Sequence, residues 1–218
     1  QHLVLPGIHI LLDSADHLLI GIQAGIRAGI PAALPGRRIK DQLLLFTFRT
    51  KAEGGKVALA HEEYLHFIRT VLATDCADLI DIEFFTAGAE LPALIEEAHT
   101  AGAAVVCSSH DFTKTPPRAE LVCRMVQMQQ AGADLPKLAV MPQSRIDVLE
   151  LLAATAEMAD QHPETPVITM SMGALGAVSR LAGETFGSAM TFANPGQASA
   201  PGQVSLDIVN EVLDALHL

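Results

Sequence analysis

Short runs of apolar residues recur along the chain, separated by longer segments with a helix-like spacing of apolar and polar positions. Continuous apolar runs of this length are typical of parallel strands buried on both faces. The runs predict strands at 43–48, 79–84, 103–107, 137–141, 166–170 and 187–192, with 8–12 as the candidate for a seventh. The segments between them predict helices at 57–73, 90–101, 118–131, 144–160, 174–182 and 205–217. This alternation indicates βα units around a parallel sheet, and therefore an α/β fold.

Polar side chains at or just beyond the strand ends bear on whether this sheet is open or closed. Arg49, Glu83, His110 and Gln143 occupy such positions. Functional groups of a (β/α)8 barrel lie at the C-terminal strand ends, so the pattern favours a TIM barrel over an open sheet. No stretch has the composition of a linker, and we expect residues 1–218 to form a single barrel domain.

Residues 21–32 differ from the rest, because they consist of the tetrapeptide repeat GIQA-GIRA-GIPA. A glycine in a helix interior costs about 1 kcal/mol relative to alanine. Two interpretations remain open for this segment. It is either a loose apolar helix packed on the sheet, or a stretch that is not the original sequence of its fold.

Composition excludes several classes of function. The 218 residues carry 14 basic and 25 acidic side chains, a formal net charge of -11, with no Trp and only Tyr64 as tyrosine, so we expect no nucleic-acid partner. The apolar segment 18–35 is broken by polar residues and glycines, and no basic stretch precedes an apolar run, so we expect neither a membrane span nor a signal peptide. Cys76, Cys107 and Cys123 form no C-x-x-C pair, which fits a reducing, cytoplasmic setting.

Two residues are candidates for catalysis. Lys137 opens an apolar strand, and burial there would lower its pKa, so that a neutral amine could attack a carbonyl and form a Schiff base. The alternative is a strand-end lysine paired with an acid. His110 ends the strand before it, and its ordinary pKa suits proton transfer near neutral pH. The alternative there is a capping or core histidine.

Three further charged residues are candidates for binding and orientation. Arg49 and Arg180 follow predicted strands, which suggests a bound carboxylate or phosphate held bidentately, with structural salt bridges as the alternative. Glu53 could orient a histidine or stabilise its charged form, although a solvated loop acid is the simpler interpretation of its local pattern.

The small-residue loop QASAPGQ at 197–203 is the last candidate feature. It could act as a lid whose Ser199 and Gln203 offer hydrogen bonds to a polyhydroxy substrate. The alternative is an ordinary Pro/Gly loop.

Taken together, these motifs have a strong resemblance to one family. The segments that carry it are FTFRTKAEGG (46–55), DLIDIEFFT (78–86), SSHDFTKTP (108–116), LPKLAVMPQS (135–144), ITMSMGALGAVSRLAGETFGSAMTF (168–192) and QASAPGQ (197–203). In this order and spacing they resemble type I 3-dehydroquinate dehydratase, over about residues 41–217. Any one motif alone is weak, whereas the collinear set is highly specific.

The resemblance implies a (β/α)8 barrel, a homodimer, and a place in the shikimate pathway. It implies dehydration of 3-dehydroquinate to 3-dehydroshikimate without a metal or organic cofactor. By resemblance, Lys137 is the Schiff-base lysine, His110 the general acid and base, and Glu53 the acid beside that histidine. The positions that hold the substrate's carboxylate and hydroxyls are matched by Arg49, Arg180, Ser199 and Gln203.

The family likeness fails at the N-terminal side. The hairpin and first strand with which the family begins are not found, and we expect residues 1–40 to be divergent, through an altered reading frame or gene decay. Segment 9–17 keeps Asp16 and His17 of a family pattern, but Ser14, or Ala15 in the neighbouring register, stands where that pattern has an arginine. A barrel without its first strand exposes two edges, so we expect reduced or absent activity.

Three hypotheses follow. The first is a type I dehydratase with impaired activity, and the second is a non-catalytic relative that binds a carboxylate ligand; turnover of 3-dehydroquinate separates them. The third is another Schiff-base barrel enzyme, such as a class I aldolase. That enzyme would need a phosphate site after strands seven and eight, and loop 197–203 offers hydroxyl and amide groups instead.

Overall fold

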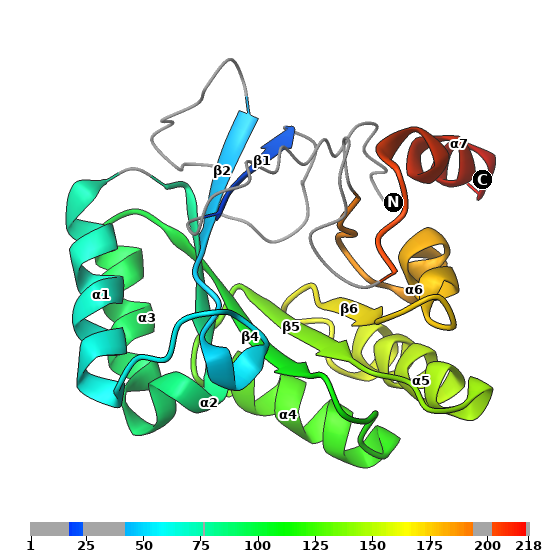
Figure 1. The fold of residues 1–218 in the computed structure, drawn as a ribbon, viewed down its shortest axis with the longest axis horizontal. Coiled ribbons are helices and arrows are strands. Elements are labelled where there is room, and N and C mark those ends of the chain that lie inside the picture. Colours follow the sequence, from blue (N-terminus) through cyan, green and yellow to red (C-terminus); the bar gives the residue numbers. More distant parts are fainter. Residues whose placement is uncertain (1–17, 24–41, 76, 194–201, 217–218) are drawn as a thin grey trace.

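A curled sheet of parallel strands forms the centre of the molecule (Figure 1). The computed structural model describes residues 18–23, 42–75, 77–193 and 202–216. The parallel strands are β2 (Gln42–Thr47), β3 (Leu79–Glu83), β4 (Ala104–Asp111), β5 (Leu135–Val140) and β6 (Ile168–Ser171). Each pairs with the next in chain order, so the five strands make a curled half-barrel of an α/β TIM-barrel fold.

Helices cover the convex side of this sheet (Figure 1). They are α1 (His61–Thr74), α2 (Phe84–Ala87), α3 (Leu91–Thr100), α4 (Arg118–Gln130) and α5 (Arg145–Gln161). The short helix α6 (Ala177–Leu181) contacts β6, and α7 (Leu206–Leu216) lies against α6. Local sequence sets several of these boundaries. The helix α4 begins directly after Pro117, and α5 begins at a capping box in which Ser144 and Asp147 satisfy each other's backbone N–H groups.

Alternate strand residues face two different clusters. On the convex side, Phe46, Ile80, Val105 and Leu138 belong to the larger core, which also contains helix residues. On the concave side, a second cluster collects the following buried residues: Leu45, Leu79, Val106, Leu135, Ile168, Met170, Met172 and Phe192. Because side chains alternate along a strand, polar residues two positions beyond these inner ones also face the concave side.

The strand β1 (Leu18–Gln23) departs from the parallel order. It pairs antiparallel with β2, from Leu18 opposite Thr47 to Gln23 opposite Gln42. The strands of a (β/α)8 barrel are all parallel, so the edge of β2 is occupied here in a different way. The helical interpretation of residues 21–32 is wrong for 21–23; the remainder of that repeat and the candidate strand 8–12 lie outside the described residues.

The prediction of a strand at 187–192 is also wrong. Among the described residues, its ladder contact is one isolated parallel bridge between Val167 and Ser188. The Thr169 N–H of β6 donates to the Ser188 hydroxyl, 3.1 Å away, so a side chain replaces the main-chain acceptor that a strand would supply. The other predicted strands from 43–48 to 166–170 are confirmed, with ends that differ by a few residues.

The predicted helices are confirmed with some shifts in length. The first begins at His61 rather than at residue 57, and the one predicted at 174–182 is the short α6 between 3-10 and irregular segments. Among the helices described, none combines the length and hydropathy needed to cross a membrane.

Candidate active site

Lys137 lies on the concave face of β5, and only 7% of its surface is exposed. Its Nζ is 3.3 Å from Asp81 Oδ2 and 4.8 Å from the centre of the Phe192 ring. Burial lowers the pKa of Lys137, and the charge of Arg49 acts in the same direction, while Asp81 opposes both. A larger share of the amine is therefore neutral than in an exposed lysine, which is the nucleophilic form.

Arg49, just beyond β2, is surrounded by carboxylates. Its Nη2 donates to Asp81 Oδ2 at 2.7 Å, and its Nη1 to Glu83 Oε1 at 3.1 Å and Glu53 Oε2 at 3.3 Å. Nη1 also donates to the Ser108 hydroxyl at 2.9 Å. Burial alone would lower the pKa of Arg49, but the three carboxylates outweigh it and the pKa is raised. Structural salt bridges, the alternative interpretation of Arg49 in the sequence analysis, therefore account for much of the hydrogen bonding of this side chain.

The two acids of β3 are fully buried and well supplied with donors. Glu83 accepts from the Thr50 N–H at 2.8 Å, the Thr50 hydroxyl at 2.7 Å and the Thr86 hydroxyl at 2.6 Å. Asp81 accepts from the Ser108 hydroxyl as well as from Arg49 and Lys137. The pKa of Asp81 is lowered: burial would raise it, and the charges of Arg49 and Lys137 prevail.

His110, at the end of β4, is held by Glu53 from the 3-10 turn Lys51–Glu53. Glu53 Oε2 lies 2.9 Å from His110 Nδ1 and accepts the His110 backbone N–H at 3.1 Å. The same oxygen accepts from the His110 backbone and from Arg49, so we assign the Nδ1-protonated tautomer, in which Nε2 carries the lone pair. The solvated-acid interpretation of Glu53 is wrong, because only 4% of the residue is exposed.

The surroundings disfavour the charged forms of both His110 and Glu53. Burial, followed by the charges of Arg49 and Lys137, lowers the pKa of His110 well below its ordinary value. Burial also raises the pKa of Glu53 to about 8, with Glu83 and Asp81 adding to the effect and Arg49 opposing it. His110 is therefore neutral at neutral pH, as a general base must be.

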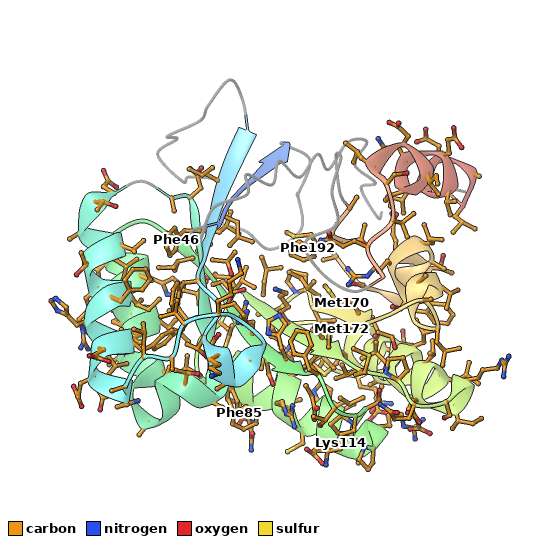
Figure 2. All side chains as sticks on the ribbon, in the orientation of Figure 1. Phe46, Phe85, Lys114, Met170, Met172 and Phe192 are labelled. Atoms are coloured by element: carbon orange, nitrogen blue, oxygen red, sulfur yellow. The ribbon has the colours of Figure 1, made fainter. Side chains whose placement is uncertain are left out.

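Arg180 approaches the concave face from α6, and 2% of it is exposed. Its Nη1 donates to Met170 Sδ at 3.4 Å and to the Phe192 carbonyl at 3.5 Å. Burial lowers the pKa of Arg180 to about 10. The Phe192 ring faces Lys137 while its carbonyl contacts Arg180, so this residue connects the two cations; Figure 2 shows it beside Met170 and Met172.

The structure describes one of the two candidate residues of the loop 197–203. Gln203 is half-buried and follows Gly202, whose α-carbon is so close to Gly173 that an added Cβ would lie 2.3 Å from the Gly173 oxygen. This contact places Gln203 beside the segment that follows β6. Ser199 lies outside the described residues.

Sequence reasoning missed three members of this site: Asp81, Ser108 and Phe192. Asp81 carried a usable signal, because it precedes Glu83 by two residues in a strand and shares its face. Ser108 precedes His110 by the same interval. Phe192 carried no usable signal, because it stands in the irregular segment 187–192, which the apolar pattern predicted as a strand.

Fold and site together define the class: an α/β barrel fold with a buried lysine on β5, a histidine at the end of β4, and two arginines, one just beyond β2 and one on α6. The chain belongs to the type I 3-dehydroquinase family, whose model matches residues 26–218. That match begins inside the segment 1–40. Within the described residues, no group of three or more His, Cys, Asp or Glu is placed to hold a metal ion.

Curated relatives are 3-dehydroquinate dehydratases. The chain is 52% identical to one from Klebsiella pneumoniae subsp. pneumoniae over 173 residues, which is 79% of this chain and 69% of the relative. It is 50% identical to one from Salmonella agona over 179 residues, 82% of this chain and 71% of the relative.

Solved structures agree. The type I 3-dehydroquinate dehydratase of Clostridium difficile matches with a TM-score of 0.78 and 46% identity, over 82% of this chain and 70% of that one. The 3-dehydroquinate dehydratase of Enterococcus faecalis matches with a TM-score of 0.76 and 41% identity, over 83% and 72% of the two chains.

Proposed function

We propose that the protein is a 3-dehydroquinate dehydratase, a hydro-lyase of the shikimate pathway, with Lys137 as its Schiff-base residue. One observation carries the residue assignment. A lysine with 7% of its surface exposed stands on the strand next to a neutral histidine, in a chain about half identical to enzymes of this name. The side chains supply a nucleophile and a base on one concave face, and the reaction needs both.

The first step is condensation. The neutral Lys137 amine attacks the C3 ketone of 3-dehydroquinate, the carbinolamine loses water, and a protonated imine forms. That iminium is an electron sink, so the proton on the neighbouring C2 becomes removable. Asp81, 3.3 Å from Nζ in the free enzyme, stabilises the positive charge of the iminium nitrogen.

The second step is elimination. His110 Nε2 takes the C2 proton, because its Nδ1 is held by Glu53. The resulting enamine expels the C1 hydroxyl, and His110 returns the proton to it, so that water leaves. Water then hydrolyses the product imine, which releases 3-dehydroshikimate and frees Lys137. General acid–base help of this kind typically contributes about 10²–10⁴-fold.

Substrate binding falls to the arginines and to the loop at 197–203. Burial destabilises the charge of Arg180, so an incoming carboxylate would stabilise it strongly. We assign the substrate carboxylate to Arg180 and the hydroxyls to Gln203 and Ser199. Arg49 contributes to the same pocket mainly by keeping Asp81, Glu83 and Glu53 in place.

A catalytically impaired protein is the second candidate, and one observation favours it. β1 pairs antiparallel with β2 at the edge where a barrel has a parallel neighbour. Among the described residues, no parallel strand lies at this edge to direct side chains into the site. We therefore expect slower turnover than in relatives that complete the barrel, with the chemistry at Lys137 retained.

The setting is proposed as cytoplasmic, because Cys107 and the exposed Cys123 are both free thiols. We further propose a homodimer. The exposed apolar side chains Ile146 and Leu149 lie one turn apart on α5 and give a second copy a surface to cover. Light scattering of the purified protein measures this mass directly.

Turnover tests the function. Purified protein is incubated with 3-dehydroquinate, and 3-dehydroshikimate is quantified by chromatography against Lys137→Met and His110→Asn. Product formation by the wild type that both variants abolish supports the proposal. Binding of 3-dehydroquinate without product identifies a non-catalytic relative, and neither binding nor product contradicts the function altogether.

A further inference from the structure

Two segments that carry the proposed acid–base pair meet at two points, only one of which involves that pair. The first is the contact of Glu53 with His110. The second lies one residue after Glu53 and two residues after His110, where Gly54 meets the ring of Phe112.

The second contact is unusually close. Gly54 has a left-handed φ of +92°, and a Cβ added to it would lie 2.2 Å from Phe112 Cε2 and 2.5 Å from Cζ. Any side chain here would displace the ring, so the ring rests directly on the glycine backbone. Glycine is needed at this position both for its φ and for this approach.

Both partners are fixed by their own segments. On the Phe112 side, Asp111 Oδ1 accepts the backbone N–H groups of Thr113 at 2.8 Å and Lys114 at 3.0 Å, and the Gln143 amide donates to the Thr113 carbonyl at 2.9 Å. These bonds hold the loop after β4 in one shape. The backbone from His110 to Phe112 belongs to this loop, so the place of the ring relative to His110 is set by the loop itself.

The turn that contains Gly54 is held by hydrogen bonds of its own backbone. The Gly55 N–H donates to the Thr50 carbonyl at 2.8 Å, and the Lys51 N–H to the Val57 carbonyl at 2.8 Å. Thr50 in turn donates its backbone N–H and its hydroxyl to Glu83. The turn that carries Glu53 is thus fixed through Thr50 on one side and contacts Phe112 through Gly54 on the other.

We propose that Phe112 is a positioning residue for the dehydration: by resting on Gly54, its ring sets the separation of Glu53 and His110 and keeps water from the pair. The inference rests on the proposed function. Phe112 is 38% exposed, so its truncation should cost less stability than that of a fully buried aromatic. The effect of Phe112 on the position of Glu53 and His110 can therefore be measured separately from its effect on the stability of the protein.

The test compares Phe112→Ala with Phe112→Tyr, which keeps the ring. Phe85→Ala is the matched control, since Phe85 is 60% exposed on α2 and its ring lies over Arg124 instead. We expect Phe112→Ala to lower kcat by about 10–100-fold with KM little changed, because a misplacement of about 1 Å can cost about 10²-fold. We expect Phe112→Tyr and Phe85→Ala to stay within about threefold of the wild type.

A pH profile distinguishes positioning from general destabilisation. The charged groups that face His110 are Glu53 of the turn, Arg49 beyond β2 and Lys137 of β5, with Asp81 and Glu83 of β3 behind Arg49, and all remain in the variant. Water admitted by Phe112→Ala reduces the burial of the imidazole. The acid limb of kcat should therefore move to higher pH in Phe112→Ala and stay in place in Phe112→Tyr.

A double-mutant cycle with Glu53→Gln decides whether Phe112 acts through Glu53. We expect Phe112→Ala to add less than about twofold to the loss already caused by Glu53→Gln. An equal loss in both backgrounds, or an unmoved acid limb, would overturn the inference. If the wild type shows no turnover, the proposed function fails by itself, and NMR titration of His110 in Phe112→Ala still decides the positioning role: a raised imidazole pKa supports it and an unchanged one contradicts it.

Discussion

Arg49 is half-buried and Arg180 is buried near one concave face, and their surroundings shift their pKa values in opposite directions. Arg49 stands among Asp81, Glu83 and Glu53, and its pKa is raised. Arg180 is buried against Met170 sulfur and the Phe192 carbonyl, and its pKa falls to about 10. Three carboxylates raise the pKa of the first guanidinium, whereas burial lowers the pKa of the second, so an added anion would stabilise the charge of Arg180.

The comparison divides the site into two regions. The β2–β5 region holds acids and bases in mutual hydrogen bonds and suits proton transfer. The β6–α6 region is apolar, with Met170, Met172 and Phe192, and suits recognition of a carboxylate. Lys137 lies between them, bonded to Asp81 on one side and stacked near Phe192 on the other.

Replacing Lys137, which contacts both regions, should have the largest effect on kcat. In Lys137→Met the nucleophile is lost, and we expect kcat to fall by more than about 10⁴-fold, beyond the range of acid–base help alone. Asp81 keeps Arg49 and Ser108 as donors, so the variant should still fold. Lys114→Met is the matched control on an exposed loop, and a similar loss there would remove the special role of Lys137.

Removing the internally paired arginine should damage the fold. Arg49→Gln leaves the buried carboxylates of Asp81 and Glu83 without the cation that they share, and it removes a donor to Glu53. Loss of one partner of a buried ion pair costs about 3–5 kcal/mol, and urea unfolding measures this in the free energy of unfolding. A change below about 1 kcal/mol would show that the carboxylates do not depend on Arg49.

Removing the other arginine should damage binding instead. We expect Arg180→Gln to raise KM for 3-dehydroquinate by about 10–100-fold, because hydrogen bonds to charged groups contribute about 1.5–3 kcal/mol. Its loss of stability should be smaller than that of Arg49→Gln, since burial already destabilises this charge. Arg145→Gln, at an exposed position of α5, serves as the control for both. Equal stability losses for the two arginines would break the comparison.

A last prediction concerns the pH dependence of stability. Glu53 has its pKa raised from 4.5 to about 8, so the folded state keeps a proton that the unfolded chain has released. This contribution is fully present below about pH 4.5 and is lost as the pH rises to about 8. We expect Glu53→Gln, which imitates the protonated acid, to lose less thermal stability than the wild type between these values. Parallel curves for the two proteins would contradict the raised pKa.

Much of the parallel architecture was predictable, because buried strands leave continuous apolar runs and polar residues mark their C-terminal ends. Lys137, His110, Glu53 and Arg49 were predicted as site residues from strand position and resemblance, and the structure brings them into one network with Asp81. The pairing of Arg49 with Asp81, 32 residues away, was not predictable, since it depends on strand register. Nor was the irregular course of 187–192, where the Ser188 hydroxyl replaces a backbone acceptor.

Borohydride trapping tests the central claim most directly. The wild-type protein is incubated with 3-dehydroquinate, reduced with borohydride, and analysed by intact and peptide mass spectrometry, with the Lys137→Met variant alongside. The account predicts one reduced adduct, located on Lys137 and lost in that variant. A folded protein that gives no adduct, or an adduct on another lysine such as Lys114, would contradict it.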